Sequence, residues 1–328
     1  MTVGIAKHLK RPGSVSGPYP ATVRDVASLN AVFSGAFTDR YRKDGLIGVH
    51  VPNLSSSIWR FAIEDADGGA MLWRGDREEV VAFNICHLSG TEGWMGPLAV
   101  SPPMQGHGLG KTVVNEGTRW LEAHGATVIG LETMPRTVDN IGFYSSLGFV
   151  PGHLTITITV ESEYAEHRII QLGRLSESER ADLVTRCSAL TYEIAPGYDF
   201  SREINLTQSL GLGDTLVLER RGSVDGFALC HTAPLVEGRG RDELRVLKLV
   251  TRSEEDVDTL TTQLADYARR SGTRRVAIRM QGGYSNLYGQ LIKRGARVRW
   301  TDLRMTLTGH PEPAQSRGGG VVLSNWEI

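Results

Sequence analysis

The sequence has few cysteines and no surplus of either charge, and both features narrow its possible functions. Among 328 residues there are three cysteines, Cys86, Cys187 and Cys230, which are too few and too far apart for a disulfide framework or a zinc site. Lysine and arginine total 36 against 37 aspartates and glutamates, so no basic surface for nucleic acid is indicated. There is no apolar run long enough to span a bilayer and no secretory segment. We therefore expect a cytoplasmic protein that binds neither nucleic acid nor membrane.

The length of the chain predicts two domains. We divide it into a flexible N-terminus (1–18), an N-terminal domain (19–165), a C-terminal domain (166–310), and a linker with an apolar tail (311–328). The tail contains the β-prone stretch 321–326, which we expect to dock on the chain's own sheet or on a partner subunit. A homodimer is therefore left open.

A glycine-rich segment, Gln105-Gly106-His107-Gly108-Leu109-Gly110, separates a predicted strand from a predicted helix. The apolar run 96–100 predicts a buried strand, and apolar residues at 109, 113, 114, 120 and 121 predict an amphipathic helix from Leu109 to His124. Amides at a helix N-terminus attract a pyrophosphate, and glycine lets the backbone approach it closely. The segment therefore predicts a phosphate site.

Three phosphate-binding patterns compete for this loop. The dinucleotide pattern G-x-G-x-x-G fails by one residue, because the glycines here run G-x-G-x-G. The P-loop pattern finds its end in Gly110-Lys111-Thr112, but its first position is Gln105 rather than glycine. The pattern Q-x-x-G-x-G fits at every position.

A second motif lies downstream, at Asn140, Phe143-Tyr144 and Gly148-Phe149. With the Q-x-x-G-x-G loop, it resembles the N…FY…GF signature of the GCN5-related N-acetyltransferase (GNAT) family over residues 20–160. The resemblance implies an α/β fold with a mixed, strongly twisted sheet (α+β in character) flanked by helices. It places a strand at Thr127–Thr133, a helix from Val138 and a strand at His153–Val160. It also implies acetyl-CoA as co-substrate and no metal.

The resemblance assigns roles to individual residues. Tyr144 would protonate the leaving thiolate. Asn140 would contact the cofactor or cap its helix. The expected cofactor-binding residues are Leu98, Ala99, Val100, Gln105, Gly106, His107, Gly108, Leu109, Gly110, Lys111, Thr112, Asn140, Phe143 and Tyr144. The general base is open between Glu92 and Glu132, which lie on the strands before and after the loop–helix segment; His87 and His107 could also act, although a lone histidine is more often structural.

The chain looks duplicated when Gly148 is placed on Gly295. One ungapped shift then puts 128–131 on 275–278, Trp120 on Tyr267, and Leu98-Ala99-Val100 on Arg245-Val246-Leu247. The boundary would lie near Glu161–Gln171. We therefore predict two tandem acyl-CoA N-acyltransferase (GNAT) folds.

The second copy has lost the motifs of the first. Gln105 falls on Arg252, Gly106 on Ser253, Gly108 on Glu255, Gly110 on Val257 and Tyr144 on Leu291. The segment 253–256 instead resembles a helix N-cap followed by acidic residues, which would repel a pyrophosphate. We predict that the C-terminal copy is degenerate and does not bind acyl-CoA.

The predicted function is an N-acetyltransferase that moves an acetyl group from acetyl-CoA to a primary amine of a small molecule, by direct attack in a ternary complex. Two alternatives remain: an acyl-CoA sensor without turnover, and a P-loop-like nucleotide-binding enzyme. The sequence does not fix the amine, the acyl length, the oligomeric state or a ligand of the second domain.

Overall fold

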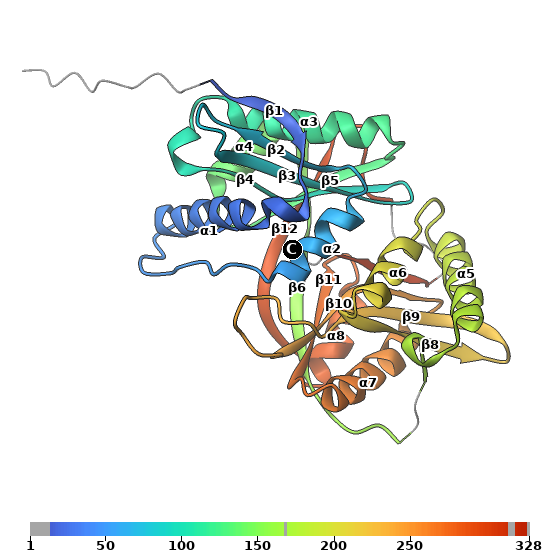
Figure 1. The fold of residues 1–328 in the computed structure, drawn as a ribbon. Helices are drawn as coiled ribbons and strands as arrows, with labels where there is room; N and C mark the ends of the chain where they lie inside the picture. The colour runs from blue at the N-terminus through green and yellow to red at the C-terminus, as the bar shows by residue number, and fades with distance from the viewer. Residues whose placement is uncertain (1–13, 167–168, 314–318, 327–328) are drawn as a thin grey trace, which may run out of the picture.

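The computed structural model describes residues 14–166, 169–313 and 319–326, and its strands form one continuous sheet. The first half contains β1 (Ser16–Pro20), α1 (Val26–Lys43), α2 (Ser56–Asp65), β2 (Ala70–Arg74), β3 (Val80–Ser89), β4 (Glu92–Val100), α3 (Leu109–Ala123), β5 (Val128–Thr133), α4 (Val138–Ser146) and β6 (Phe149–Glu161). The second half contains β7 (Ile170–Gln171), α5 (Glu177–Ile194), α6 (Ser201–Ser209), β8 (Gly213–Arg220), β9 (Ser223–His231), β10 (Glu243–Thr251), α7 (Glu254–Arg270), β11 (Arg275–Gln281), α8 (Ser285–Lys293) and β12 (Arg297–Leu307). A last strand, β13 (Val321–Ser324), follows. Strands and α-helices thus occur in the same order in both halves, as a duplicated unit predicts (Figure 1).

Most predicted elements around the glycine-rich loop are confirmed. The helix expected from Leu109 is α3, the strand expected to Thr133 is β5, and α4 begins at Val138. The N-terminal boundary needs correction, because residues 16–18, assigned to the flexible N-terminus, belong to β1, which pairs with β2. Residues 1–13 lie outside the described residues. None of the helices in the described ranges is long and apolar enough to cross a membrane.

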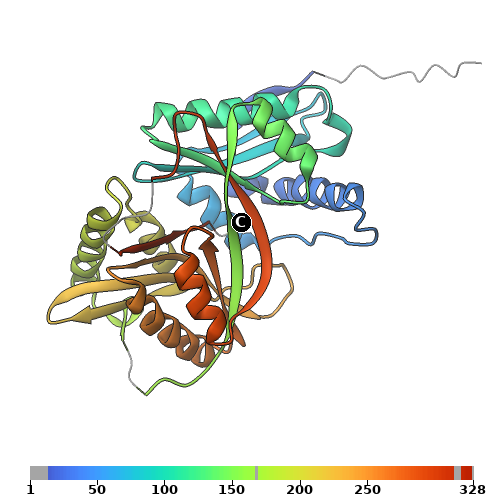
Figure 2. The same ribbon diagram turned by 180° about the vertical axis from the view of Figure 1, so that it is seen from behind.

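The two halves exchange their closing strands. The order of the sheet is β1-β2-β3-β4-β5-β12-β6-β11-β10-β9-β8-β7, so β12 of the second half lies between β5 and β6 of the first. At about 3.3 Å per residue, β6 and β12 are long enough to cross both halves, and they run side by side through the middle of the molecule (Figure 2). Each half supplies a mixed sheet as predicted, but the halves are not separate domains joined by a linker.

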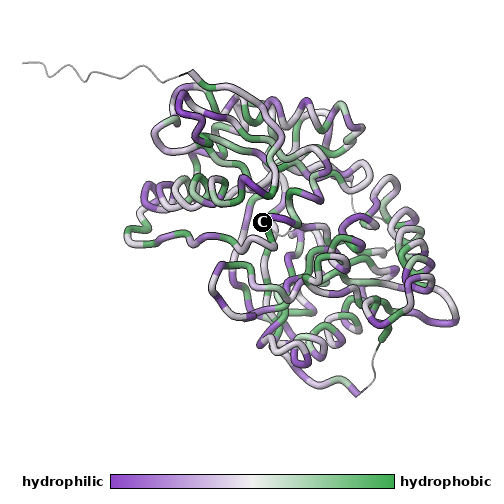
Figure 3. The backbone as a smooth tube through the Cα atoms, viewed as in Figure 1, coloured by the Kyte–Doolittle hydropathy of each residue, from purple (hydrophilic) through white to green (hydrophobic). Residues whose placement is uncertain are grey.

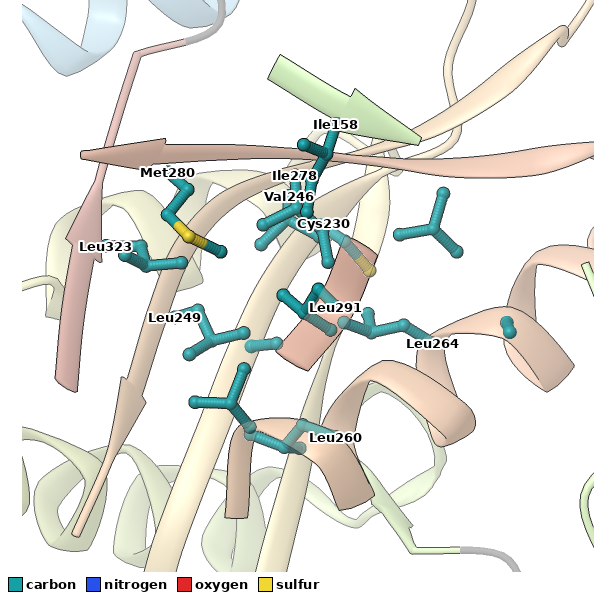
Figure 4. Close-up of a cluster of buried hydrophobic side chains, with 14 of the residues drawn as sticks. Ile158, Cys230, Val246, Leu249, Leu260, Leu264, Ile278, Met280, Leu291 and Leu323 are labelled. Atoms are coloured by element: carbon teal, nitrogen blue, oxygen red, sulfur yellow. The ribbon is translucent and has the colours of Figure 1, made fainter. Parts of the chain in front are cut away.

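Helices pack on the sheet through apolar clusters. In the second half, Leu249 and Ile278 on the strands meet Leu260 of α7 and Leu291 of α8 (Figure 4). In the first half, α3 and α4 pack on β4 and β5 in the same way. Hydrophobic and hydrophilic residues alternate along these helices, as expected for elements with one buried side (Figure 3).

The C-terminal tail docks on the chain's own sheet, which confirms one of the two predicted outcomes. Its strand β13 pairs antiparallel with β10, with Leu323 opposite Leu249. The side chains of Val321 and Leu323 are buried in the cluster of the second half. The tail thereby returns the chain to the centre of the molecule, where the C-terminus is marked (Figures 1 and 2).

Candidate active site

The parallel strands β4 and β5 separate halfway along their length. Their pairing runs from Glu92–Val128 to Met95–Leu131 and ends there within the described residues. On its other edge β5 pairs with β12 from Gly130 to Thr133, while β4 continues along β3 as far as Val100. The separation begins at Gly96, where β4 bulges against β3 and φ is 153°. We call this the β4–β5 split. Between Pro97, which has no N–H, and Val100, whose carbonyl accepts from Gln105, the backbone of β4 can pair with an extended ligand there.

The glycine-rich loop leads from the end of β4 into α3. Gly106 and Gly108 have φ values of 79° and 86°, in the left-handed region that favours glycine. A Cβ at either position would meet open space, so the backbone conformation rather than crowding requires glycine. Gly108 is the N-cap of α3 and supplies no side-chain cap. The first-turn amides of α3 are therefore available to an anion.

Gln105 fixes the loop in place. Its Nε2 donates a hydrogen bond to the carbonyl oxygen of Val100 at 2.9 Å. Its Oε1 accepts one from Nζ of Lys43, at the end of α1, also at 2.9 Å. The side chain therefore joins the loop to β4 and α1, so the predicted cofactor contact of Gln105 would involve its backbone.

The end of β4, the start of α3 and α4 converge at one point. A Cβ on Gly110 would lie 3.4 Å from Cζ of Phe143 and 4.0 Å from Cγ2 of Val100. Leu98 packs against the same apolar cluster, which also holds Leu109. The structure thus brings the two sequence motifs together, as the family resemblance implied.

The other expected cofactor-binding residues surround this point with different exposure. His107, Lys111 and Thr112 are exposed, whereas Ala99 is buried on the opposite side of β4 in the cluster that includes α1. Asn140 donates a hydrogen bond to Oγ1 of Thr133 at 3.5 Å. It is not the N-cap of α4, which is residue 137, so its alternative role as a cap is wrong.

Tyr144 is held as a neutral phenol. Its side chain is buried in the cluster shared by α3 and α4, and its ring lies 6.2 Å from that of Phe149. Burial raises the pKa of Tyr144 to about 12. A phenol with this pKa keeps its proton at neutral pH and can donate a hydrogen bond to a thiolate.

Glu92 does not have the surroundings of a general base, and the prediction for it needs correction. Its carboxylate is 1% exposed and accepts hydrogen bonds from Nε1 of Trp94 at 3.2 Å and from Oγ of Ser324 at 2.6 Å. Burial raises its pKa, against the opposing charge of Lys248. The carboxylate is enclosed where Ser324 of the C-terminal tail contacts β4, and it is not exposed to an incoming amine.

Glu132 is engaged in ion pairs. Nη1 of Arg304 lies 2.9 Å from its carboxylate, and Arg279 and Thr155 also donate to it. Burial raises the pKa of Glu132, but the two guanidinium groups outweigh it, so the pKa lies below its ordinary value. A stabilised carboxylate of this kind is a weak base. Both predicted bases are therefore held by residues of the second half: Glu92 by Ser324, and Glu132 by Arg279 and Arg304. Strand periodicity alone could not reveal these contacts.

A histidine–aspartate pair lies at the split; the sequence offered His87 as a possible base but did not predict its contact with Asp65. Nδ1 of His87 is 2.7 Å from Oδ2 of Asp65, and its Nε2 is 3.1 Å from the carbonyl oxygen of Gly96. Asp65 lies at the end of α2, so this pair joins α2 to the residue at which β4 leaves β5. These residues form no sequence motif, because they come together only when β3 packs on α2.

The second half contains a corresponding split, and the tail fills it. Parallel pairing of β10 with β11 runs from Glu243–Arg275 to Val246–Ile278, and from Lys248 onward β10 pairs with β13 instead. By strand pairing, Leu98 of β4 corresponds to Leu249, since each lies six residues after the first paired residue, Glu92 or Glu243. The ungapped alignment, which put Leu98 on Arg245, is therefore wrong in this strand, although it is right for β5 and β11.

The second half also lacks a loop for pyrophosphate. Eight residues separate β4 from α3, whereas two separate β10 from α7. Oγ of Ser253 caps α7 by accepting a hydrogen bond from the amide of Asp256, and three acidic residues occupy the first turn. Ser253 thus corresponds to Gly108 rather than to Gly106. The buried Leu291 of α8 stands where Tyr144 stands in α4.

Comparisons with known proteins agree with this geometry. Residues 37–149 match the acetyltransferase (GNAT) family. A putative acetyltransferase from Pyrococcus horikoshii is similar over 98% of both chains, with a TM-score of 0.67 and 16% identity. A tandem GNAT protein from the clavulanic acid biosynthesis pathway is similar over 92% of this chain and 100% of its own, with a TM-score of 0.58 and 11% identity.

A third similar structure is a GCN5-related N-acetyltransferase from Sphaerobacter thermophilus. It has a TM-score of 0.58 and 16% identity, and the similarity covers 90% of this chain and 96% of that one. No curated protein matches the sequence.

The family match supports an acyltransferase that takes its acyl group from acyl-CoA. The first half thus contains a domain that matches the GNAT family over residues 37–149, and the chain as a whole has a tandem GNAT fold with a degenerate second unit.

Proposed function

We propose that the first half transfers an acetyl group from acetyl-CoA to a primary amine of a small molecule, in a ternary complex. The observation that carries this proposal is the β4–β5 split, which leads directly into a helix start with free amides. The pantetheine arm would pair with β4 from residue 97 to 100, and the pyrophosphate would lie at the first turn of α3. The thioester would then lie near Gly96.

The leaving thiolate needs stabilisation, and the neutral phenol of Tyr144 can supply it by donating a hydrogen bond to the sulfur. The thiolate that leaves CoA is a stronger base than the thioester sulfur, so a hydrogen bond from the phenol strengthens as the C–S bond breaks. The raised pKa of Tyr144 keeps the phenol protonated throughout.

The acceptor must reach the split as a neutral amine. An amine with a lysine-like pKa of about 10.4 costs about 4.6 kcal/mol to deprotonate at pH 7, at 1.36 kcal/mol per pKa unit. Glu92 and Glu132 are engaged by hydrogen bonds and ion pairs with the second half. We therefore propose that water at the open side of the split carries this proton away. The acceptor side is bounded by α1, whose end is held to residue 137 by Asp44 at 2.8 Å.

The first test is calorimetric titration of the whole chain with acetyl-CoA, with ATP and magnesium as a control. We expect saturation at one acetyl-CoA per chain and no heat from ATP. A panel of small amines, followed by release of the CoA thiol, then identifies the acceptor class. ATP binding without acetyl-CoA binding would revive the P-loop alternative.

A sensor without turnover is the second candidate, because the cofactor motifs could remain after catalysis has been lost. It predicts one acetyl-CoA per chain and no thiol release above the buffer rate with any amine. Transfer to any member of the panel removes this candidate.

A further inference from the structure

The C-terminal tail segment, Val321–Trp326, is held by the second half as if it were a bound ligand. The hydroxyl of Tyr284 donates to the carbonyl of Val322 at 3.2 Å and accepts from its amide at 3.0 Å. Nε2 of Gln281 donates to the carbonyl of Ser324 at 3.1 Å, and the amide of Asn325 donates to residue 247 at 2.9 Å. The tail segment is thus a fixed strand in the β10–β11 split.

The same tail segment also contacts the first half. Oγ of Ser324 donates to Glu92 at 2.6 Å and accepts from Nζ of Lys248 at 3.0 Å. The ring of Trp326 lies 5.3 Å from the ring of Trp94 and 6.1 Å from that of His87, on which it stacks at 28°. The tail segment therefore leads from the filled split of one half to the strands that form the open split of the other.

Two routes connect Trp326 with Gly96. His87 reaches the carbonyl of Gly96 with Nε2 at 3.1 Å, and Trp94 lies two residues before Gly96 on β4. Both His87 and Trp94 are 2% exposed, so neither ring can shift without disturbing its neighbours.

We propose that the tail segment is a positioning element for the first half: Trp326 and Ser324 fix β4 at Gly96, where the thioester would lie. This inference rests on the proposed function. It assigns the degenerate half a role, which is to hold the tail segment against the catalytic half. A displacement of about 1 Å at a reacting centre can lower a rate by about 100-fold, so a packing contact at this place acts on turnover.

The decisive comparison uses three single variants. Trp326→Ala should lower kcat by about tenfold or more and leave acetyl-CoA affinity within about twofold, since the loop at α3 is untouched. Trp326→Phe should recover most of kcat; no hydrogen bond is lost, because Nε1 of Trp326 has no partner among the described residues. Val322→Ala is the matched control, since its side chain packs on an apolar cluster formed mostly by residues of the second half and it takes no part in the ring contacts of Trp326 with Trp94 and His87.

The control separates positioning from stability. Val322→Ala should lower the melting temperature but keep kcat within about twofold at a temperature where every variant is folded. The proposal is overturned if Trp326→Ala keeps the wild-type kcat. It is also overturned if both alanine variants lose kcat in proportion to their loss of melting temperature.

A complementation experiment tests the tail segment itself. A chain ending at residue 313 should lose kcat, and a peptide of residues 319–326 added in trans should restore it by strand addition. The same peptide with Trp326→Ala should bind without restoring kcat. Equal restoration by both peptides would contradict the proposal, and the point variants decide the matter if the shortened chain does not fold.

Hydrogen exchange separates this proposal from the proposed function. Trp326→Ala, but not Val322→Ala, should speed amide exchange at residues 94–98 in the chain without ligand. If no amine is acetylated but this difference is found, the proposed function fails and positioning stands. If amines are acetylated and exchange at 94–98 is the same in both variants, positioning fails.

Discussion

In both halves two parallel strands separate partway along their length, and the halves differ in what lies beside the first of these strands after the separation. In the first half, β4 beyond Met95 no longer pairs with β5, and no other strand among the described residues takes the place of β5 there. In the second, β10 beyond Lys248 is paired with β13 of the same chain. A split in a sheet exposes backbone groups that require partners. A cofactor can supply them reversibly and a strand permanently, so one framework yields a binding site in one half and a structural seam in the other.

The helix starts that follow the two splits differ in the same sense. α3 begins at a left-handed glycine and leaves its first amides free, whereas α7 is capped by Ser253 and begins with carboxylates. The first arrangement attracts an anion and the second repels one. We therefore expect the second half not to bind acyl-CoA, because the positions for both the pantetheine arm and the pyrophosphate differ from those of the first half. The predictions below test this contrast, starting with the largest expected effect.

Tyr144→Phe should lower kcat by about 100-fold or more, as expected for loss of a general acid, and should leave acetyl-CoA affinity within about twofold. The matched variant is Tyr288→Phe in α8 of the second half, which should change neither quantity. Steady-state rates and calorimetry measure both. Equal effects of the two variants would contradict the assignment of chemistry to the first half.

The pH profile checks the same role for Tyr144. The active form is the neutral phenol, and burial raises its pKa to about 12. Loss of kcat from its ionisation should therefore begin only well above pH 10, where an exposed tyrosine would already be half ionised. A fall in kcat centred near pH 10, with the fold intact by circular dichroism, would show that the phenol is not buried as described.

Gly108→Val should weaken acetyl-CoA binding by about 100-fold, which is about 2.7 kcal/mol, because a β-branched residue resists the left-handed conformation. Gly125→Val is a close control: its φ of 84° nearly equals the 86° of Gly108, and a Cβ at either position meets open space. Both variants should lose similar stability, but only the first should lose affinity. If both bind acetyl-CoA normally, the loop is not the phosphate site.

Local features of the fold were predictable because they depend on neighbours in sequence. The loop requires glycine at two left-handed positions, and α3 shows its apolar spacing within one stretch of chain. The convergence of Gly110 with Phe143 followed from the family resemblance, since no local rule places α4 beside α3. The docking of the tail followed from its apolar residues, which a chain seldom leaves in water.

The strand exchange and the true partners of the carboxylates were not predictable. β6 and β12 are both long strands with a similar alternation of residues. Their sequences therefore do not indicate whether β5 pairs with β6 of its own half or with β12 of the other half. Glu132 is flanked by Arg304 only because of this exchange. An ungapped alignment also could not detect that the connection before α7 is shorter than the one before α3. The parallel pairing of β10 with β11 nevertheless matches that of β4 with β5.

Leu249→Ala should destabilise the chain by about 2–5 kcal/mol without changing acetyl-CoA affinity, because Leu249 is 0% exposed opposite Leu323 and the substitution leaves a cavity. Leu98→Ala, at the corresponding position of β4, should cost less stability, since Leu98 is only half-buried, and should weaken binding. Denaturant unfolding and calorimetry compare the two. Loss of affinity in the Leu249 variant would mean that the second split also binds cofactor.

The smallest expected effect concerns the start of α7. Ser253→Ala removes the side chain that accepts from the amide of Asp256 at 3.3 Å, and loss of such a cap costs about 1 kcal/mol. Ser253→Thr should keep most of that stability, since a hydroxyl remains. Acetyl-CoA should still saturate at one per chain in both variants, because uncapping α7 frees amides without removing the carboxylates of its first turn. Binding of a second acetyl-CoA to the alanine variant would show that the cap alone, and not the acidic turn and the short connection, keeps the second half empty.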